Sequence, residues 1–114
     1  MKMKAKETYV WITTQFDAVH SFPNAEGDVD FLKHAHRHLF KVKVWIQVFH
    51  NEREIEFITF KRFIAEKLLF TDYAFMSCES MSDCLFNEIT KKYPKRKIKI
   101  ELSEDGENGS YKEY

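Results

Sequence analysis

A segment of alternating apolar and polar residues from His36 to Phe49 constrains the fold of this chain more than any other feature. One set of alternate positions holds Phe40, Val42, Val44, Ile46 and Val48, and the other holds Arg37, Lys41, Lys43 and Gln47. Because successive side chains of a strand point to opposite faces, the pattern predicts a strand with one buried and one exposed face. The segment exceeds the roughly 3–10 residues of most strands, so it is a long strand for a small domain.

A second alternating segment, Thr8 to His20, predicts another strand of the same kind. Its apolar face holds Val10, Ile12, Phe16, Ala18 and His20, and Gln15 and Asp17 face the other way. Residues 21–35, which include Pro23, Asn24 and Gly27, predict a long loop. If the two strands form an antiparallel hairpin, the end of the first lies beside the start of the second.

Two helices and two further strands are predicted after a polar turn at residues 51–53. The first helix has an apolar stripe formed by Phe57, Phe60, Ile64 and Leu68. The second helix is predicted to begin near Ser80, because Ser80 and Asp83 have the spacing of a capping box, and its stripe is Met81, Leu85 and Ile89. After Pro94, a third strand alternates Ile98, Ile100 and Leu102 with Lys97, Lys99 and Glu101. Residues 105–109 predict a turn, and residues 110–114 predict a short last strand.

The order of these elements, ββααββ, predicts an α+β fold in which a four-stranded antiparallel sheet carries both helices on one face. A chain of 114 residues suits one domain over residues 1–114. The 18 basic and 18 acidic residues balance, which argues against a nucleic-acid partner. No apolar run reaches the roughly 20 residues of a membrane span. Cys78 and Cys84 are expected to be free thiols in a cytoplasmic protein.

All five histidines lie between positions 20 and 50. His36 and His38 are two apart on a strand, so their side chains leave the same face about 7 Å apart. His20 ends the other strand of the hairpin, so we expect the three imidazoles to converge. Such a set predicts a catalytic-type zinc site with one open position for water or substrate. His34 and His50 are expected to be solvated, and Arg37 to point to the opposite face of the sheet.

Two histidine motifs resemble those of a known family. Residues 16–20, FDAVH, resemble the F-x-A-x-H motif of the 6-pyruvoyl-tetrahydropterin synthases and the bacterial 6-carboxytetrahydropterin synthases of queuosine synthesis. Residues 36–40, HRHLF, look like the H-G-H-x-(Tyr/Phe) strand of that family. Weaker matches follow in the same order: residues 55–57 to hydrophobic-Asp-Phe, residues 80–83 to Pro-Thr-x-Glu, and residues 98–104 to the last long strand with its Glu.

The resemblance implies the tunnelling fold (T-fold), whose sheets assemble edge to edge into trimeric barrels that commonly stack as hexamers. It implies a Zn²⁺ ion on His20, His36 and His38, and a pterin-like ligand whose ring edge is gripped by Glu104. It also implies a lyase that acts on a reduced pterin such as dihydroneopterin triphosphate. Glu104 keeps the parity of Ile100 and Leu102, so it is expected to point to the core-side face.

This chain departs from the family at its catalytic residues. The family's Cys before H-x-H is absent, and Leu32 or Asp30 falls in its place. The family's Asp-His pair becomes Asp72-Tyr73. We therefore predict that Asp30 replaces the thiolate as a base and that Asp72 or Tyr73 handles protons. Two alternatives stay open, a zinc protein that binds a pterin or purine without turnover and a purely structural metalloprotein.

Overall fold

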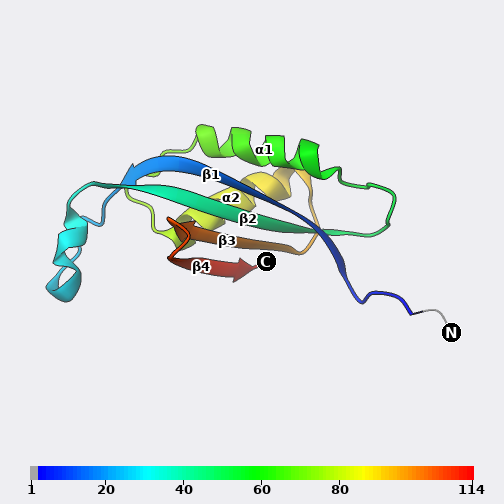
Figure 1. The fold of residues 1–114 in the computed structure, drawn as a ribbon, viewed down its shortest axis with the longest axis horizontal. Coiled ribbons are helices and arrows are strands. Elements are labelled where there is room, and N and C mark those ends of the chain that lie inside the picture. The colour runs from blue at the N-terminus through cyan, green and yellow to red at the C-terminus, as the bar shows by residue number, and fades with distance from the viewer. Residues whose placement is uncertain (1–2) are drawn as a thin grey trace.

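The computed structural model describes residues 3–114, so residues 1–2 of the predicted domain lie outside its described part. In chain order the elements are β1 (Thr8–His20), η1 (Gly27–Lys33), β2 (His36–Val48), α1 (Phe57–Leu69), α2 (Cys78–Lys92), β3 (Ile98–Glu104) and β4 (Asn108–Glu113). The strands form one sheet in the order β1-β2-β3-β4, and each neighbouring pair is antiparallel (Figure 1). The predicted α+β fold with ββααββ order is confirmed.

One face of the sheet packs against both helices. The register sets Ile12 opposite Val44 and Val44 opposite Ile100, so the apolar positions of three strands share that face. The helix α1 lies against β1, and α2 lies against β3 and β4. The helices complete a single core with residues that are all 5% exposed or less: Phe60, Ile64, Leu68, Met81, Leu85 and Ile89. Burial of each such side chain contributes roughly 1.5–3 kcal/mol, which holds the two layers together.

The start of α2 corrects the prediction for that helix. The helix begins at Cys78, and Ser77 is its N-cap, whose hydroxyl oxygen accepts a hydrogen bond from the Ser80 backbone N–H. Asp83, expected to close a capping box with Ser80, instead accepts hydrogen bonds from Lys112 and Tyr114 on the β4 side. Ser77 is the cap in place of Ser80, because the backbone is extended at Ser77 and helical from Cys78 onward. Both cysteines lie on α2 and are free, as predicted.

The segment between β1 and β2 is also more regular than predicted. Residues 21–35 were expected to form a loop, and the structure contains η1 within them, kinked at Val29. This short 3₁₀ helix projects from the end of the sheet at which β1 ends and β2 begins (Figure 1). Among residues 3–114, no helix is both long enough and apolar enough to cross a membrane.

The strand β4 begins at Asn108, two positions before the predicted last strand, and it lies very close to β3. A Cβ atom built on Gly109 would be 2.2 Å from the carbonyl oxygen of Leu102. Only glycine fits such a close backbone approach without a shift of the strand. The tight β3–β4 turn places residues 104–109 at the same end of the sheet as the histidines.

A partly buried ion pair joins the turn after β2 to the segment before β3. Arg96 Nη2 lies 2.7 Å from Glu54 Oε2, and Glu54 Oε1 accepts a hydrogen bond from the Phe49 N–H. Both contacts lower the pKa of Glu54, from 4.5 to about 2, and the hydrogen bond from Arg96 has the larger effect. The pair therefore stabilises the folded state fully above pH 4.5, and this contribution is lost as the pH falls toward 2.

We expect Glu54→Gln to lower stability at neutral pH and to flatten the loss of stability between pH 4.5 and 2. Denaturant unfolding of the variant and the wild type at several pH values in that range measures both effects. Glu52→Gln is a suitable control, because Glu52 is exposed in the same turn, its carboxylate forms no ion pair among residues 3–114, and its backbone hydrogen bond to His50 is kept by the substitution. An unchanged pH profile in Glu54→Gln would mean that the ion pair is not formed in solution.

Candidate metal centre

The histidines His20, His36 and His38 converge at one end of the core-side face of the sheet. The register pairs His20 directly with His36, and His38 follows on the same face of β2. One ligand nitrogen from each ring can be chosen so that all three lie within 4.8 Å of one another. His20 is 7% exposed, and the other two are half-buried. The convergence predicted from the sequence is therefore present.

Each of the three imidazoles is held through its Nδ1 atom. His20 Nδ1 lies 2.8 Å from the Met76 carbonyl oxygen, and His36 Nδ1 lies 2.9 Å from the His34 carbonyl oxygen. His38 Nδ1 lies 2.7 Å from Asp105 Oδ2. Carbonyl and carboxylate oxygens only accept, so the Nδ1–H donates in each contact and the Nε2 atom is left for another partner. Metal-binding histidines are oriented in the same way.

The Nε2 atom of His20 is buried and has no hydrogen-bond partner among residues 3–114. A buried polar atom without a partner costs about 1–3 kcal/mol, so a ligand for this nitrogen would stabilise the site. Three imidazole nitrogens that converge in this way suit a divalent ion such as Zn²⁺. The residues present therefore fit the metal that the sequence predicts.

Glu104 reaches the same cluster from the end of β3. Its Oε2 lies 3.1 Å from His38 Nε2, and its Oε1 lies 3.5 Å from His20 Nε2 without a hydrogen bond between them. The register pairs Glu104 with Phe40, which places it on the core-side face as predicted. The carboxylate therefore lies directly beside the three-histidine cluster.

A cavity of about 520 Å³ opens beside the cluster. His20, His36 and Glu104 form its polar wall, and the first turn of α2 forms another side. Its apolar wall consists of Phe22, Leu32, Phe75 and Met76. The cavity has room for a bicyclic heterocycle, and it brings that ligand next to the convergent nitrogens.

The residues predicted to handle protons do not join this cluster. Asp30 is exposed and pairs with Lys33 at 2.5 Å, and Asp72 accepts a hydrogen bond from the Ala74 N–H. The buried hydroxyl of Tyr73 donates to the Leu68 carbonyl oxygen, and burial raises the pKa of Tyr73 to about 12. No hydrogen bond or ion pair within residues 3–114 connects Asp30, Asp72 or Tyr73 to the three histidines. Their catalytic roles stay predictions.

Leu32, and not Asp30, lines the cavity. Both residues aligned with the missing family Cys, so the structure distinguishes them. An aliphatic side chain at this wall cannot take a proton from a ligand. Leu32, the residue of η1 that lines the cavity, therefore has no acid–base role there.

The sequence reasoning missed two residues of the centre. Asp105 was predicted only as part of a turn. Its carboxylate orients His38 and accepts a hydrogen bond from the Leu39 backbone N–H. The hydrogen bond with His38 is the main reason that the pKa of Asp105 is lowered. Cys78 lines the cavity at the start of α2, and burial, with Glu104 and Glu79 nearby, raises its pKa to about 11. A thiol with that pKa is not a thiolate at neutral pH, so Cys78 is not an activated nucleophile in this environment. Neither residue has a local sequence signal, because each reaches the centre only through strand and helix packing.

The positions of His34, His50 and Arg37 agree with the prediction. His34 and His50 are exposed. Arg37 lies on the face opposite the histidines, where its Nη2 is 3.1 Å from Asp17 Oδ1 across the β1–β2 pair.

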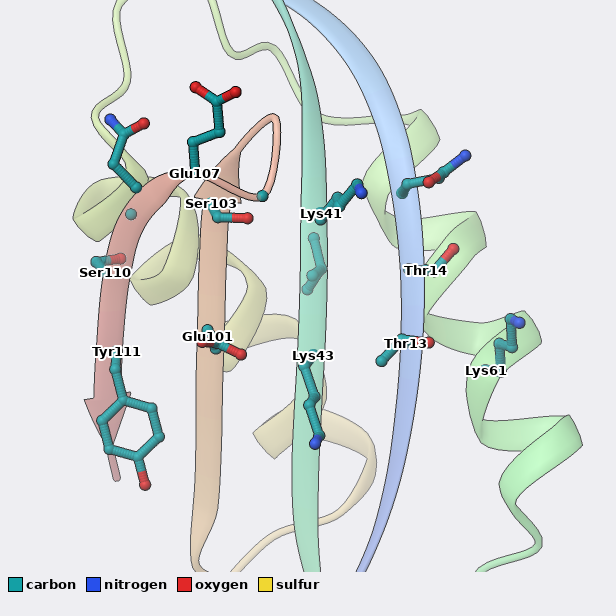
Figure 2. A pocket seen from close by; sticks show the side chains of 15 residues that line it. Thr13, Thr14, Lys41, Lys43, Lys61, Glu101, Ser103, Glu107, Ser110 and Tyr111 are labelled. Carbon is teal, nitrogen blue, oxygen red and sulfur yellow. The ribbon is translucent and has the colours of Figure 1, made fainter.

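A second hollow, larger than the cavity beside the histidines, lies away from them. It spans about 920 Å³ on the outer face of the sheet, and Figure 2 shows Lys41, Lys43 and Glu101 among its lining residues. Its Lys43 ammonium lies 4.3 Å and 4.6 Å from the ring centroids of Trp11 and Trp45. Because none of the three histidines lines this hollow, we assign the candidate site to the smaller cavity on the core side.

The contact of Asp105 with His38 gives a first prediction for the centre. Asp105→Asn removes the charge that holds the His38 Nδ1–H, and loss of such an outer partner lowers metal affinity by about 10–100-fold. Competition with a chromogenic zinc chelator measures the change. Asp17→Asn, which alters an exposed carboxylate on the opposite face, should leave the affinity unchanged. Equal affinities in both variants would contradict the role of Asp105.

Comparison with protein-family models and with curated proteins gives no match to this chain.

Proposed function

We propose that this chain is a divergent, zinc-binding relative of the pterin synthases with a tunnelling fold, and that it acts on a reduced pterin. The observation that carries the proposal is the set of three imidazoles whose Nδ1 atoms are all held by acceptors. One ring nitrogen from each lies within 4.8 Å of the others, beside a cavity of suitable size. The FDAVH and HRHLF motifs supply the link to this family.

In the proposed reaction, a zinc ion bound by His20, His36 and His38 supplies Lewis-acid polarisation of hydroxyl and carbonyl oxygens of the ligand. Glu104 accepts hydrogen bonds from the pyrimidine-like edge of the ring. Phe22 and Phe75 cover the ring and keep water away from it. A lyase of this kind also needs a base, and Asp30 or Asp72 is proposed for that role.

The proposed assembly is a homo-oligomer, a trimer or hexamer, formed through the sheet edges. Because β1 and β4 are the outer strands, each leaves one edge unpaired within residues 3–114. A groove beside β1 is lined in part by Trp11, Phe57 and Ile58, which are 54–55% exposed. Exposed apolar residues next to a free edge favour pairing with another copy. Light scattering coupled to size-exclusion chromatography tests this assembly.

A second candidate is a zinc-containing protein that binds a pterin or purine without turnover. Two observations favour it: Leu32 lines the cavity where the family has its Cys, and Asp30 is engaged with Lys33. In this case the metal, the cavity and Glu104 are kept for recognition. The cavity walls suit a planar heterocycle equally well in both candidates.

Incubation of the zinc form with dihydroneopterin triphosphate, followed by chromatography of pterin products, separates the two candidates. Turnover that is lost in Asp30→Asn and kept in Asp28→Asn, its exposed neighbour on η1, supports the enzyme with a carboxylate base. Tight binding without products supports the binder. Neither binding nor turnover by the zinc-loaded protein contradicts both.

A further inference from the structure

We infer that Glu104 is a fourth protein ligand of the metal when no organic ligand is present, and that it closes the centre until a ring displaces it. The metal-ligand role follows from the geometry of the cluster. The displacement step rests on the proposed function, because it takes Glu104 to be the residue that grips the ring.

The first argument is the convergence of possible ligand atoms at the centre. The Nδ1 atoms of the three histidines are directed outward to Met76, His34 and Asp105, which leaves their Nε2 atoms for another partner. Glu104 lies 3.1 Å from His38 Nε2 and 3.5 Å from His20 Nε2. Carboxylate oxygens and imidazole nitrogens both bind zinc, and atoms bound at about 2 Å to one tetrahedral ion lie roughly 3.3 Å apart. The spacing of Glu104 from the two histidines is therefore that of ligands of a shared ion.

The second argument is charge. Among residues 3–114, the charged or chargeable side chains that pair with Glu104 are His20 and His38, and no lysine or arginine reaches it. A divalent ion at the centre would balance the carboxylates of Glu104 and Asp105. A charge-neutral set is the arrangement that a half-buried site tolerates best. The count favours a metal ion bound by Glu104 over a carboxylate left without a cation.

The third argument is position. Glu104 is 25% exposed by its side chain and lines the cavity together with His20 and His36. A carboxylate in this place lies between the metal centre and the space for the ligand. The N–H donors of a ring that enters the cavity compete with the metal for the same two oxygens. Ligand entry and metal coordination are therefore coupled through one side chain.

The test compares wild type, Glu104→Gln and Glu107→Gln with metal alone. Glu107 is an exposed acid in the adjacent turn and makes no side-chain contact with the histidines, so it is a matched control. We expect Glu104→Gln to lower zinc affinity by at least about tenfold, the lower end of the cost for outer-shell partners. We also expect it to alter the visible absorption of the Co²⁺-substituted protein, with Glu107→Gln unchanged in both measurements.

Thermal unfolding in the presence of a chelator checks that the variants fold, and Glu104→Asp provides a second variant with the charge retained. Its zinc affinity should lie between those of the wild type and Glu104→Gln. Zinc affinity within about threefold of the wild type and an unaltered Co²⁺ spectrum in Glu104→Gln would overturn the inference.

Addition of 7,8-dihydroneopterin to the Co²⁺-substituted wild type tests the displacement. We expect the pterin to change the Co²⁺ spectrum of the wild type, and to change the spectrum of Glu104→Gln less. Binding of the pterin with an unchanged spectrum would contradict displacement. Failure of the pterin to bind, with the metal effects of Glu104→Gln intact, would contradict the proposed function and leave the metal-ligand role of Glu104 supported.

Discussion

Replacement of His36 by Ala is expected to abolish tight zinc binding. The variant loses one of three convergent ring nitrogens, so its affinity should fall by more than the roughly 10–100-fold that loss of an outer-shell partner costs. His36 is only half-buried, and its neighbours on the core face keep their packing, so the fold should persist. Competition with a zinc chelator measures the affinity directly.

His34→Ala is the matched control for this prediction. His34 is exposed two positions away, and it contributes to the centre only through its backbone carbonyl, which the substitution keeps. Thermal unfolding gives a second measurement. At a free zinc concentration 100 times Kd, linkage adds about 2.7 kcal/mol to the stability of a protein that binds the ion only when folded. Wild type and His34→Ala should show this stabilisation. Its presence in His36→Ala would mean that the metal binds elsewhere.

Phe40→Ala is expected to cause the largest loss of stability. Phe40 is 0% exposed on the inner strand β2, near the histidine end of the sheet, and its ring stacks on Phe16 with 5.2 Å between the ring centroids. Removal of such a buried ring leaves a cavity and costs about 3–5 kcal/mol. For a domain of this size the midpoint of thermal unfolding should fall on the order of 10 °C or more.

The same substitution should also weaken the metal centre. The Phe40 ring packs edge-to-face with His20 and His38, with 5.2 Å and 5.9 Å between the ring centroids. Phe40 therefore limits the orientations of both imidazoles. Zinc affinity, measured well below the unfolding temperature, should therefore fall together with stability. Phe49→Ala is the control, since Phe49 is 63% exposed and its loss should cost no more than about 1 kcal/mol. Equal destabilisation by both variants would contradict the assigned core.

The sequence predicted the fold well because its patterns repeat over many residues. Alternation over residues 8–20 and 36–48 sets both the buried face and the register of the hairpin, since a slip of one residue would expose the whole apolar set. The start of α2 was predicted less well. The prediction placed the cap at Ser80, and the structure has it at Ser77, because the helical backbone begins at Cys78.

The candidate site was likewise predictable from the sequence only in part. The place of His20, His36 and His38 follows from strand pairing, so the sequence alone predicted their convergence. Leu32 and Asp30 were both possible at the cavity wall, and the path of η1 decided for Leu32. That choice matters for chemistry because it places an aliphatic side chain where a base was expected.

By itself, the sequence determined the sheet, its two covering helices and the set of histidines that can hold a metal. These features depend on periodicity and on neighbouring strands, which local patterns encode. Only the tertiary structure brought Asp105 to His38, Glu104 to the Nε2 atoms and Cys78 to the cavity. Each of these contacts joins segments far apart in the chain, and their geometry depends on how the β3–β4 turn and α2 pack against the end of the first hairpin.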